Sequence, residues 1–278
     1  MELFNGGCAR LKDIPVLTEK EFRERTIQAC RAGARLSSLF AAPEPEGDIR
    51  LTAVLGRDED STLEIFSTLI AKERPYYQSL TPELLQAHLF EREIAEQWAV
   101  TPQGHPWLKP VRYHANYRGV PDLWEGIRER IIPGVYPFYA VEGEEAHEVG
   151  VGPVHAGIIE PGHFRFQCYG EEVMHLEIQL GYQHRGIEPL LLRKGLQEAT
   201  VLSESIAGDT SVGHAIAFCE VVESLSGCRV PLKALALRGI ALELERLANH
   251  AGDLGALGMD AGFLPTSAYF GRMRGDYL

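Results

Sequence analysis

The chain has 278 residues, of which 45% are hydrophobic, and its 39 acidic and 27 basic side chains give a net charge of −12. This length allows two compact domains, because single hydrophobic cores stop growing at roughly 250 to 300 residues. The acidic balance argues against a nucleic acid or an anionic membrane surface as the main partner, since both carry negative charge. Docking onto basic protein surfaces fits the same balance.

The five cysteines, Cys8, Cys30, Cys168, Cys219 and Cys228, are odd in number and lie far apart, with no C-x-x-C pair among them. This distribution predicts neither a disulfide framework nor a thiolate metal site. The sequence also contains no run of about 18 apolar residues and no apolar signal-peptide core. We therefore expect a cytoplasmic chain whose connection to a membrane comes through another protein of the same complex.

The first part of the sequence predicts a mixture of strands and helix. Residues 34–43 and 49–57 are short runs of strand type with the turn EPEGD between them, and residues 61–70 predict a third strand. A helix is predicted over residues 81–99, with Thr81 as its N-cap and a proline at the first helical position. This pattern is typical of an α+β domain.

Four prolines within residues 100–123 preclude regular structure and mark the end of a first domain, residues 1–120. After it, the alternation in FRFQCY and VMHLEIQL predicts two strands joined by a glycine turn. From Glu188 onward the pattern becomes helical, and its clearest helix covers residues 231–258. We expect the second domain, residues 121–278, to be a small β-region that leads into helices, and the whole chain to be of the α+β class.

The helix over residues 231–258 carries an apolar stripe and, beside it, a ridge of charged side chains. Spacings of three and four along a ridge suit an exposed face with ion pairs. They suit equally a buried line of charges that moves protons between helices. We interpret the ridge as structural and solvated; it consists of Glu243, Arg246, His250 and Asp253, with Arg238 before it.

Histidines are frequent in the second half of the chain, at positions 155, 163, 175, 184, 214 and 250. No two of them have the close spacing of a zinc site on one helix, so each alone predicts a hydrogen-bonded structural histidine. The sequence therefore predicts no metal site from spacing. In HRGIE, the basic pair followed by Glu188 likewise favours a structural ion pair over a catalytic one.

Charge is divided unevenly along EREIAEQWAVTPQGHPWLKPVR. Glu91, Glu93 and Glu96 crowd one helix despite the repulsion between like charges, and a basic tail through Lys109 and Arg112 follows a Gly-His-Pro turn. This division predicts docking surfaces rather than a catalytic centre.

The same stretch resembles the signature of the 30-kDa peripheral-arm subunit of respiratory complex I. The stretch GPVHAGIIEPGHFRFQCYGEEVMHLEIQLGYQHRGIE resembles the start of the large subunit of membrane-bound group 4 [NiFe]-hydrogenases and of the related 49-kDa subunit of complex I. Arg238, Glu243, Arg246 and His250 fit the family pattern R-x4-E-L-x-R-x3-H. The resemblance covers about residues 80–278, and a fused order of the two domains also occurs in formate hydrogenlyase-type proteins.

In nickel hydrogenases of this family, a loop reads approximately E-R-I-C-G-x-C-x-x-x-H-x-x-A, and its two thiolates are soft ligands of the nickel–iron centre. In this chain the loop reads ESIAGDTSVGHAIA: Glu204, Gly208 and His214 match, but Ala207 and Thr210 occupy the cysteine positions. The family's second ligand pair falls beyond residue 278, and we expect the chain to be part of a longer protein. The resemblance thus implies the family's architecture without nickel, and we expect no metal or other cofactor to be bound by this chain.

The resemblance also implies candidate proton and quinone positions. In complex I the same loop carries a tyrosine that contacts the quinone headgroup, and Gly208 stands in its place here. Glu160 falls where nickel hydrogenases of this family carry a proton-transfer glutamate, and a partly buried carboxylate with a raised pKa exchanges protons near neutral pH. His155, His184 and His214 extend this candidate relay.

Together these resemblances imply a peripheral subunit at the cytoplasmic face of the inner membrane, in a multi-subunit oxidoreductase that couples electron transfer to ion translocation. The expected partners are a small iron–sulfur subunit with 4Fe-4S clusters and membrane subunits that translocate ions, and NAD(H) would bind only through another subunit. One alternative is a quinone-reducing subunit of complex I type, with the headgroup near Gly208 and His155. The other is a catalytically silent assembly scaffold.

Overall fold

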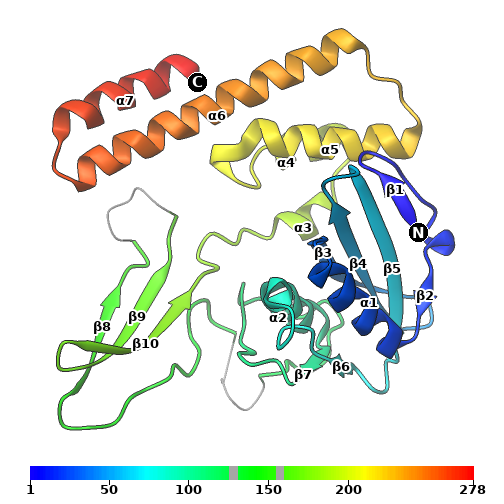
Figure 1. The fold of residues 1–278 in the computed structure, drawn as a ribbon, viewed down its shortest axis with the longest axis horizontal. Helices are drawn as coiled ribbons and strands as arrows, with labels where there is room; N and C mark the ends of the chain where they lie inside the picture. Colours follow the sequence, from blue (N-terminus) through cyan, green and yellow to red (C-terminus); the bar gives the residue numbers. More distant parts are fainter. Residues whose placement is uncertain (125–130, 155–159) are drawn as a thin grey trace. The chain divides into compact units, whose positions relative to one another are not determined.

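The computed structural model describes residues 1–124, 131–154 and 160–278. The chain divides into two compact units, Met1–His184 (unit 1) and Arg185–Leu278 (unit 2), whose elements are labelled in Figure 1. Helices and sheets are both present, so the expected α+β class is confirmed. The domain boundary expected near residue 120 stays a prediction.

A five-stranded sheet forms the first part of unit 1, with the order β1-β5-β4-β3 and with β2 pairing to β5 in parallel. The other pairs in this sheet are antiparallel. The three longest strands are the ones that the apolar runs predict. The strands are β1 (Glu2–Phe4), β2 (Val16–Leu17), β3 (Arg35–Pro43), β4 (Ile49–Arg57) and β5 (Thr62–Ile70), and a 3-10 turn, Leu11–Asp13, precedes β2.

Helix α1 (Glu19–Arg31) packs against this sheet. It begins with a capping box, in which the hydroxyl of Thr18 accepts the N–H of Glu21 and the carboxylate of Glu21 accepts the N–H of Thr18. The apolar side chains of α1 and of the sheet then form one buried cluster, which includes Phe22, Ile27, Leu39, Leu51, Leu55 and Phe66.

The next helix begins later than the sequence predicts. Instead of a helix over residues 81–99, the structure has a 3-10 turn, Leu85–Ala87, followed by α2 (His88–Trp98). Thr81 is buried, and its hydroxyl donates to the carboxylate of Glu91. The N-cap prediction for Thr81 is wrong because a charged acceptor ten residues ahead binds its hydroxyl.

The rest of unit 1 is built from short strands. β6 (Tyr76–Gln78) and β7 (Thr101–Gln103) pair in parallel. β8 (Ala146–Val151), β9 (His163–Tyr169) and β10 (Glu172–Gln179) form an antiparallel sheet in the order β10-β9-β8. The last two are the strands predicted from FRFQCY and VMHLEIQL.

The sheet of β8, β9 and β10 buries polar side chains. Glu177 and Gln179 of β10 are buried, whereas the alternate residues Leu176 and Ile178 are exposed. Alternation therefore predicts the strand but not which of its faces is covered. The polar face is buried because it finds partners in the segment after α2, as described below.

Unit 2 is helical. Its long helix α6 packs against α7 along glycines: a Cβ on Gly258 would lie 3.1 Å from the backbone nitrogen of Ser267, so the two helices approach closely only because residue 258 has no side chain. None of the helices in the described part of the chain has the length and apolar character needed to cross a bilayer. The elements are α3 (Ile187–Leu191), α4 (Leu196–Ser203), a 3-10 turn (Gly208–Thr210), α5 (Ser211–Ser226), α6 (Leu232–Asp260) and α7 (Leu264–Tyr277).

Candidate functional site

Ala207 and Thr210, which the sequence resemblance places at nickel-ligand positions, lie in the loop between α4 and α5. The loop leaves α4 after Ser203, passes Ala207 in an extended conformation and makes a single 3-10 turn before α5 starts at Ser211. His214 lies in the first turn of α5 and is half-buried. The loop-then-helix arrangement expected from the sequence is therefore present.

The start of α5 is capped from another helix. The first backbone N–H groups of a helix have no partner within it, and Thr210, at the N-cap position, makes no side-chain hydrogen bond to them. Glu245 of α6 accepts the N–H of Val212 at 2.6 Å and that of Gly213 at 3.2 Å. A carboxylate at this place also suits the positive end of the helix dipole.

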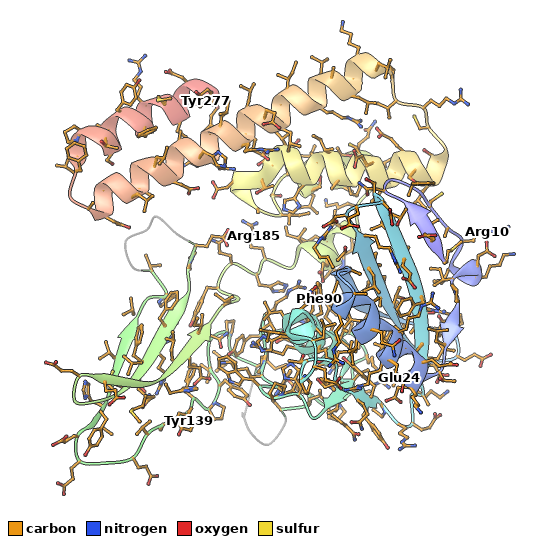
Figure 2. All side chains as sticks on the ribbon, in the orientation of Figure 1. Arg10, Glu24, Phe90, Tyr139, Arg185 and Tyr277 are labelled. Atoms are coloured by element: carbon orange, nitrogen blue, oxygen red, sulfur yellow. The ribbon has the colours of Figure 1, made fainter. Side chains whose placement is uncertain are left out.

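Three further side chains hold the loop, either by its backbone or by the carboxylate of Asp209. Asn249 of α6 donates its amide N–H to the carbonyl of Asp209 at 2.7 Å, and Arg274 of α7 donates to the Asp209 carboxylate at 3.1 Å. Arg185, labelled in Figure 2, donates to the carbonyls of Ser205 and Ile206. The loop is thus bonded to α6, to α7 and to the segment before α3.

Two cavities flank the start of α5. One, of about 310 Å³, is lined by the polar side chains of Asp209, Glu245, Asn249 and Arg274 and by the backbone of Gly208. The other, of about 510 Å³, is mainly apolar and is lined by Leu237, Ile216, Cys219 and Arg238 among others. Both volumes fall in the range of small-molecule sites.

The residues of this loop do not fit a nickel–iron centre. The methyl group of Ala207 has no ligand atom, and the neutral hydroxyl of Thr210 is a poor substitute for a bridging thiolate. Cys219 lies inside α5 and outside the loop. Within the described ranges, His, Cys, Asp and Glu side chains form no group of three or more that could hold a metal ion. Gly208, which the sequence resemblance places at the position of the quinone-contacting tyrosine, has no hydroxyl.

The charged ridge of α6 separates into an exposed part and a paired part. Arg246 and Glu243 form an exposed ion pair at 2.9 Å, and His250 and Asp253 are exposed as well. Arg238 instead makes two hydrogen bonds, at 2.9 and 2.5 Å, to the carboxylate of Glu223 on α5, and this guanidinium lowers the pKa of Glu223. Arg238 therefore connects two helices and does not belong to the exposed ridge.

The candidate relay residues are distributed over both units. Glu160, expected to be partly buried, is exposed in unit 1. His184 is half-buried in the same unit, with its ring stacked on that of His114 at a centroid distance of 5.3 Å. His214 belongs to unit 2, and His155 lies outside the described residues. The relay role of these four residues stays a prediction.

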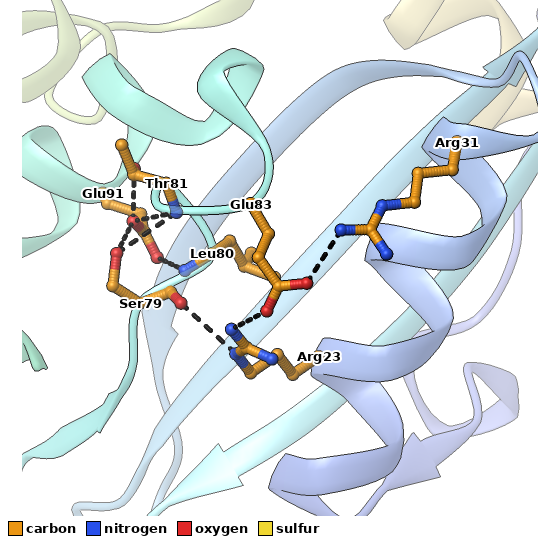
Figure 3. A network of polar contacts seen from close by, with 7 residues as sticks. All are labelled: Arg23, Arg31, Ser79, Leu80, Thr81, Glu83 and Glu91. Carbon is orange, nitrogen blue, oxygen red and sulfur yellow. Dashed lines mark hydrogen bonds and ion pairs between the residues drawn. The ribbon is translucent and has the colours of Figure 1, made fainter. Parts of the chain in front are cut away.

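Of the glutamates of α2, Glu91 and Glu96 are buried and Glu93 is half-buried, so the docking-surface interpretation is wrong. Glu91 is 0% exposed and accepts hydrogen bonds from the hydroxyls of Ser79 and Thr81, both at 2.6 Å, and from the N–H groups of Leu80 and Thr81 at 2.8 and 3.1 Å. Figure 3 shows this network beside the exposed carboxylate of Glu83. Its four donors offset the desolvation of the charge.

The carboxylate of Glu96 binds the segment that follows α2. It is buried and accepts the N–H groups of Val111 at 3.1 Å, Arg112 at 2.7 Å and Tyr113 at 2.6 Å. Arg112 also forms an ion pair at 2.5 Å with Glu93. All three glutamates therefore have partners within unit 1, which removes the expected repulsion.

In the basic tail, Lys109 is buried and Arg112 is half-buried. Lys109 is 1% exposed and donates to Glu177 of β10, itself 3% exposed, at 2.6 Å. Burial lowers the pKa of Lys109, although the hydrogen bond to Glu177 opposes this effect. Tyr113 donates its hydroxyl to the side-chain oxygen of Gln179, also on β10, at 2.6 Å. The segment around residues 109–113 thus connects α2 to the polar face of β10.

The sequence patterns do not predict these hydrogen bonds and ion pairs, because the two partners of each are far apart in the sequence. Glu245 lies more than 30 residues from the N–H groups that it caps, and Lys109 lies 68 residues from Glu177. The charged residue types themselves were the available signal, since carboxylates and amines that face the interior need partners.

No family model matches the chain. Among curated proteins, it is 32% identical over 219 residues to hydrogenase-4 component G of Escherichia coli (strain K12), which is 72% of this chain and 38% of that protein. It is 31% identical over 258 residues to formate hydrogenlyase subunit 5 of the same strain, covering 84% of this chain and 44% of the relative. With the C/D subunit of the NADH-quinone oxidoreductase of Bdellovibrio bacteriovorus it shares 24% identity over 204 residues, covering 69% and 36%.

The chain spans less than half the length of each of these relatives. A solved structure, the trypsin-resistant fragment of Nqo5, aligns with a TM-score of 0.30 and 22% identity over 34% of this chain and 80% of that one, a score too low to establish a shared fold. The sequence matches extend over most of this chain. The chain therefore belongs to the superfamily of group 4 [NiFe]-hydrogenase large subunits and complex I 49-kDa subunits, with a domain like the complex I 30-kDa subunit at its N-terminal side.

Proposed function

We propose that this chain is part of the large subunit of a membrane-bound, multi-subunit oxidoreductase that works without nickel. In such a complex, electrons arrive through iron–sulfur clusters of a partner subunit, and their transfer is coupled to ion translocation by membrane subunits. The names of the relatives, which are subunits of hydrogenases and of NADH-quinone oxidoreductases, support this class of reaction.

The proposal depends most on the loop between α4 and α5, which is bonded in place although it lacks both thiolates. Its backbone is bonded to Arg185, Glu245 and Asn249, whereas Ala207 and Thr210 replace the two thiolates. A loop kept in place without its ligands supports an enzyme that retains the family's architecture and has lost hydrogen cleavage.

The proposed partners follow from the same family membership. They are a small subunit with 4Fe-4S clusters and ion-translocating membrane subunits, and the complex would lie with this chain at the cytoplasmic face of the inner membrane. NAD(H), where it takes part, would bind to another subunit.

A second candidate is a quinone-reducing subunit. It is favoured by the cavity of about 310 Å³ beside Gly208, because this cavity combines the donors Asn249 and Arg274 with apolar walls. A quinone carbonyl accepts hydrogen bonds from such donors. A silent scaffold is the remaining alternative.

Purification of the complete complex, followed by assays with hydrogen, quinone analogues and a series of redox dyes, separates these functions. We expect electron transfer to an acceptor without hydrogen oxidation or evolution. Saturable quinone reduction would favour the second candidate. Hydrogen turnover would contradict the proposal. The absence of every electron-transfer activity in an assembled complex would also contradict it and would favour the scaffold.

We further propose that Glu160, with His155, His184 and His214, handles protons in that complex. Glu160→Gln keeps the size of the side chain but removes its titratable proton, so a relay role predicts a large loss of turnover with normal assembly. Glu188→Gln is the matched control, since we interpret Glu188 as a structural residue. A turnover within about twofold of wild type, or roughly 0.5 kcal/mol in the barrier, would contradict the role of Glu160.

A further inference from the structure

The loop between α4 and α5 is held by side chains that are not themselves at the former ligand positions. The contacts from α6 come from Glu245 and Asn249, which are four residues apart and therefore lie on one face of that helix. Neither residue is among the four that fit the family pattern on this helix. Their neighbour Arg246 pairs with Glu243 at the exposed surface instead.

The bonds from these two residues reach the backbone on both sides of Thr210. Asn249 donates to the carbonyl of Asp209, and Glu245 accepts the N–H of Val212. Bonds to backbone atoms fix the path of the chain whatever side chain the loop carries at position 210. Arg274 adds a bond from α7 to the Asp209 carboxylate, so the 3-10 turn is tied to two helices.

We propose that Glu245, Asn249 and Arg274 are positioning residues that hold the loop Ala207–Ser211 in its ligand-presenting shape without a metal. This inference rests on the proposed function, in which the loop works without nickel. Thiols restored at positions 207 and 210 would be presented together by a preformed backbone and would bind a soft divalent ion, with release of their protons.

The first test is amide hydrogen exchange on the full-length wild-type chain. The N–H groups of Val212 and Gly213 should exchange slowly, and Glu245→Ala should remove most of that protection. Arg246→Ala, in the same helix, is the matched control and should leave the protection unchanged. Rapid exchange of both amides in the wild-type chain would overturn the proposal, as would protection that survives Glu245→Ala.

The second test uses Co²⁺ as a probe and gives a readout that a general loss of stability does not imitate. The double variant Ala207→Cys/Thr210→Cys should bind Co²⁺ with thiolate-to-metal charge-transfer absorption, and the wild-type chain should show no such band. Adding Asn249→Ala should weaken Co²⁺ binding about tenfold, equivalent to about 1.4 kcal/mol, whereas adding Arg246→Ala should not.

Equal Co²⁺ affinity with and without Asn249→Ala would contradict the positioning role, and so would an absence of Co²⁺ binding by the double variant. These results differ from a failure of the proposed function. Nickel bound to the wild-type chain would contradict the proposed function, while unprotected amides at Val212 and Gly213 would contradict the positioning role alone.

Discussion

The segment around α2 in unit 1 and the helix α6 in unit 2 are both rich in charged residues, and the two regions use them differently. In unit 1, Glu91 and Lys109 are 0% and 1% exposed and bind internal partners. On α6, the side chain of Arg246 is 57% exposed, and Leu257 of the same helix is 65% exposed. A dense charge pattern therefore marks the interior of one region and the surface of the other.

This difference changes where an interaction surface is to be sought. The charged residues of unit 1 around α2 stabilise its own fold, because their carboxylates and amines bind the unit's backbone and the strand β10. The helices of unit 2 instead carry many exposed apolar side chains, which are typical of a surface that another protein covers. Substitutions in the two regions should therefore differ strongly in their effect on stability.

The largest effect is expected for Glu91→Ala. Four buried donors would lose their acceptor, and since each costs about 1 to 3 kcal/mol when unsatisfied, we expect a loss of about 5 kcal/mol or more. Urea unfolding followed by tryptophan fluorescence measures it, because all three tryptophans belong to unit 1. Glu83→Ala, which removes only the exposed pairs with Arg23 and Arg31, is the control and should have little effect. Similar losses for both variants would contradict the buried network.

A smaller but still large loss is expected for Lys109→Met, about 3 to 5 kcal/mol, because it leaves the charge of Glu177 buried and unpaired. Adding Glu177→Gln should restore part of the stability, since the amide remains an acceptor for the N–H of Tyr139. Arg246→Ala on α6 should cost about 0.5 kcal/mol or less. If the double variant loses as much free energy of unfolding as the two single variants added together, the two side chains are not coupled.

A pH dependence is the smallest of the expected effects. His105 accepts the N–H of Trp107 at Nδ1, at 3.0 Å, so its proton sits on Nε2, which faces the carbonyl of His88 at 3.2 Å. Burial lowers the pKa of His105, and the neighbouring Arg92 acts in the same direction. The folded state therefore prefers the neutral ring. The contribution of this preference to the stability of the fold is fully present above the ordinary histidine pKa of 6.5 and is lost as the pH falls below it.

The measurement is the urea midpoint of the wild-type chain between about pH 8 and pH 5. His105→Gln retains a donor and an acceptor but does not titrate, so its midpoint should depend less on pH. His147→Gln, at an exposed position in β8, is the control. An equal slope for His105→Gln and the wild-type chain would show that His105 is not responsible.

Much of the fold could be predicted from the sequence. Periodicity identified β3, β4, β5, β9 and β10 as strands and α6 as a helix, because local side-chain spacing decides these elements. It failed at Thr81, where the hydroxyl binds Glu91 instead of capping a helix. It also failed for the three glutamates of α2, because burial depends on partners such as the backbone of residues 111–113 that no local pattern reveals.

The candidate site divides in the same way. The assignment of Ala207 and Thr210 to ligand positions comes from the resemblance of one short loop to the family pattern, and it stays a prediction. Glu245 and Asn249 could not be identified from the sequence, since they meet the loop only after α6 packs beside α5. The sequence assigned the charged side chains of α6 to one exposed ridge, whereas Glu245 and Asn249 lie on a neighbouring face that contacts the loop.

Nickel analysis of the wild-type chain tests the central claim most directly. The full-length protein, produced in cells that contain nickel and an active hydrogenase maturation system, is purified with a chelator and its metals are quantified by mass spectrometry. The loop with Ala207 and Thr210 predicts no stoichiometric nickel under conditions in which a related nickel hydrogenase, prepared in parallel, acquires its metal. One nickel per chain that survives chelation would contradict the account.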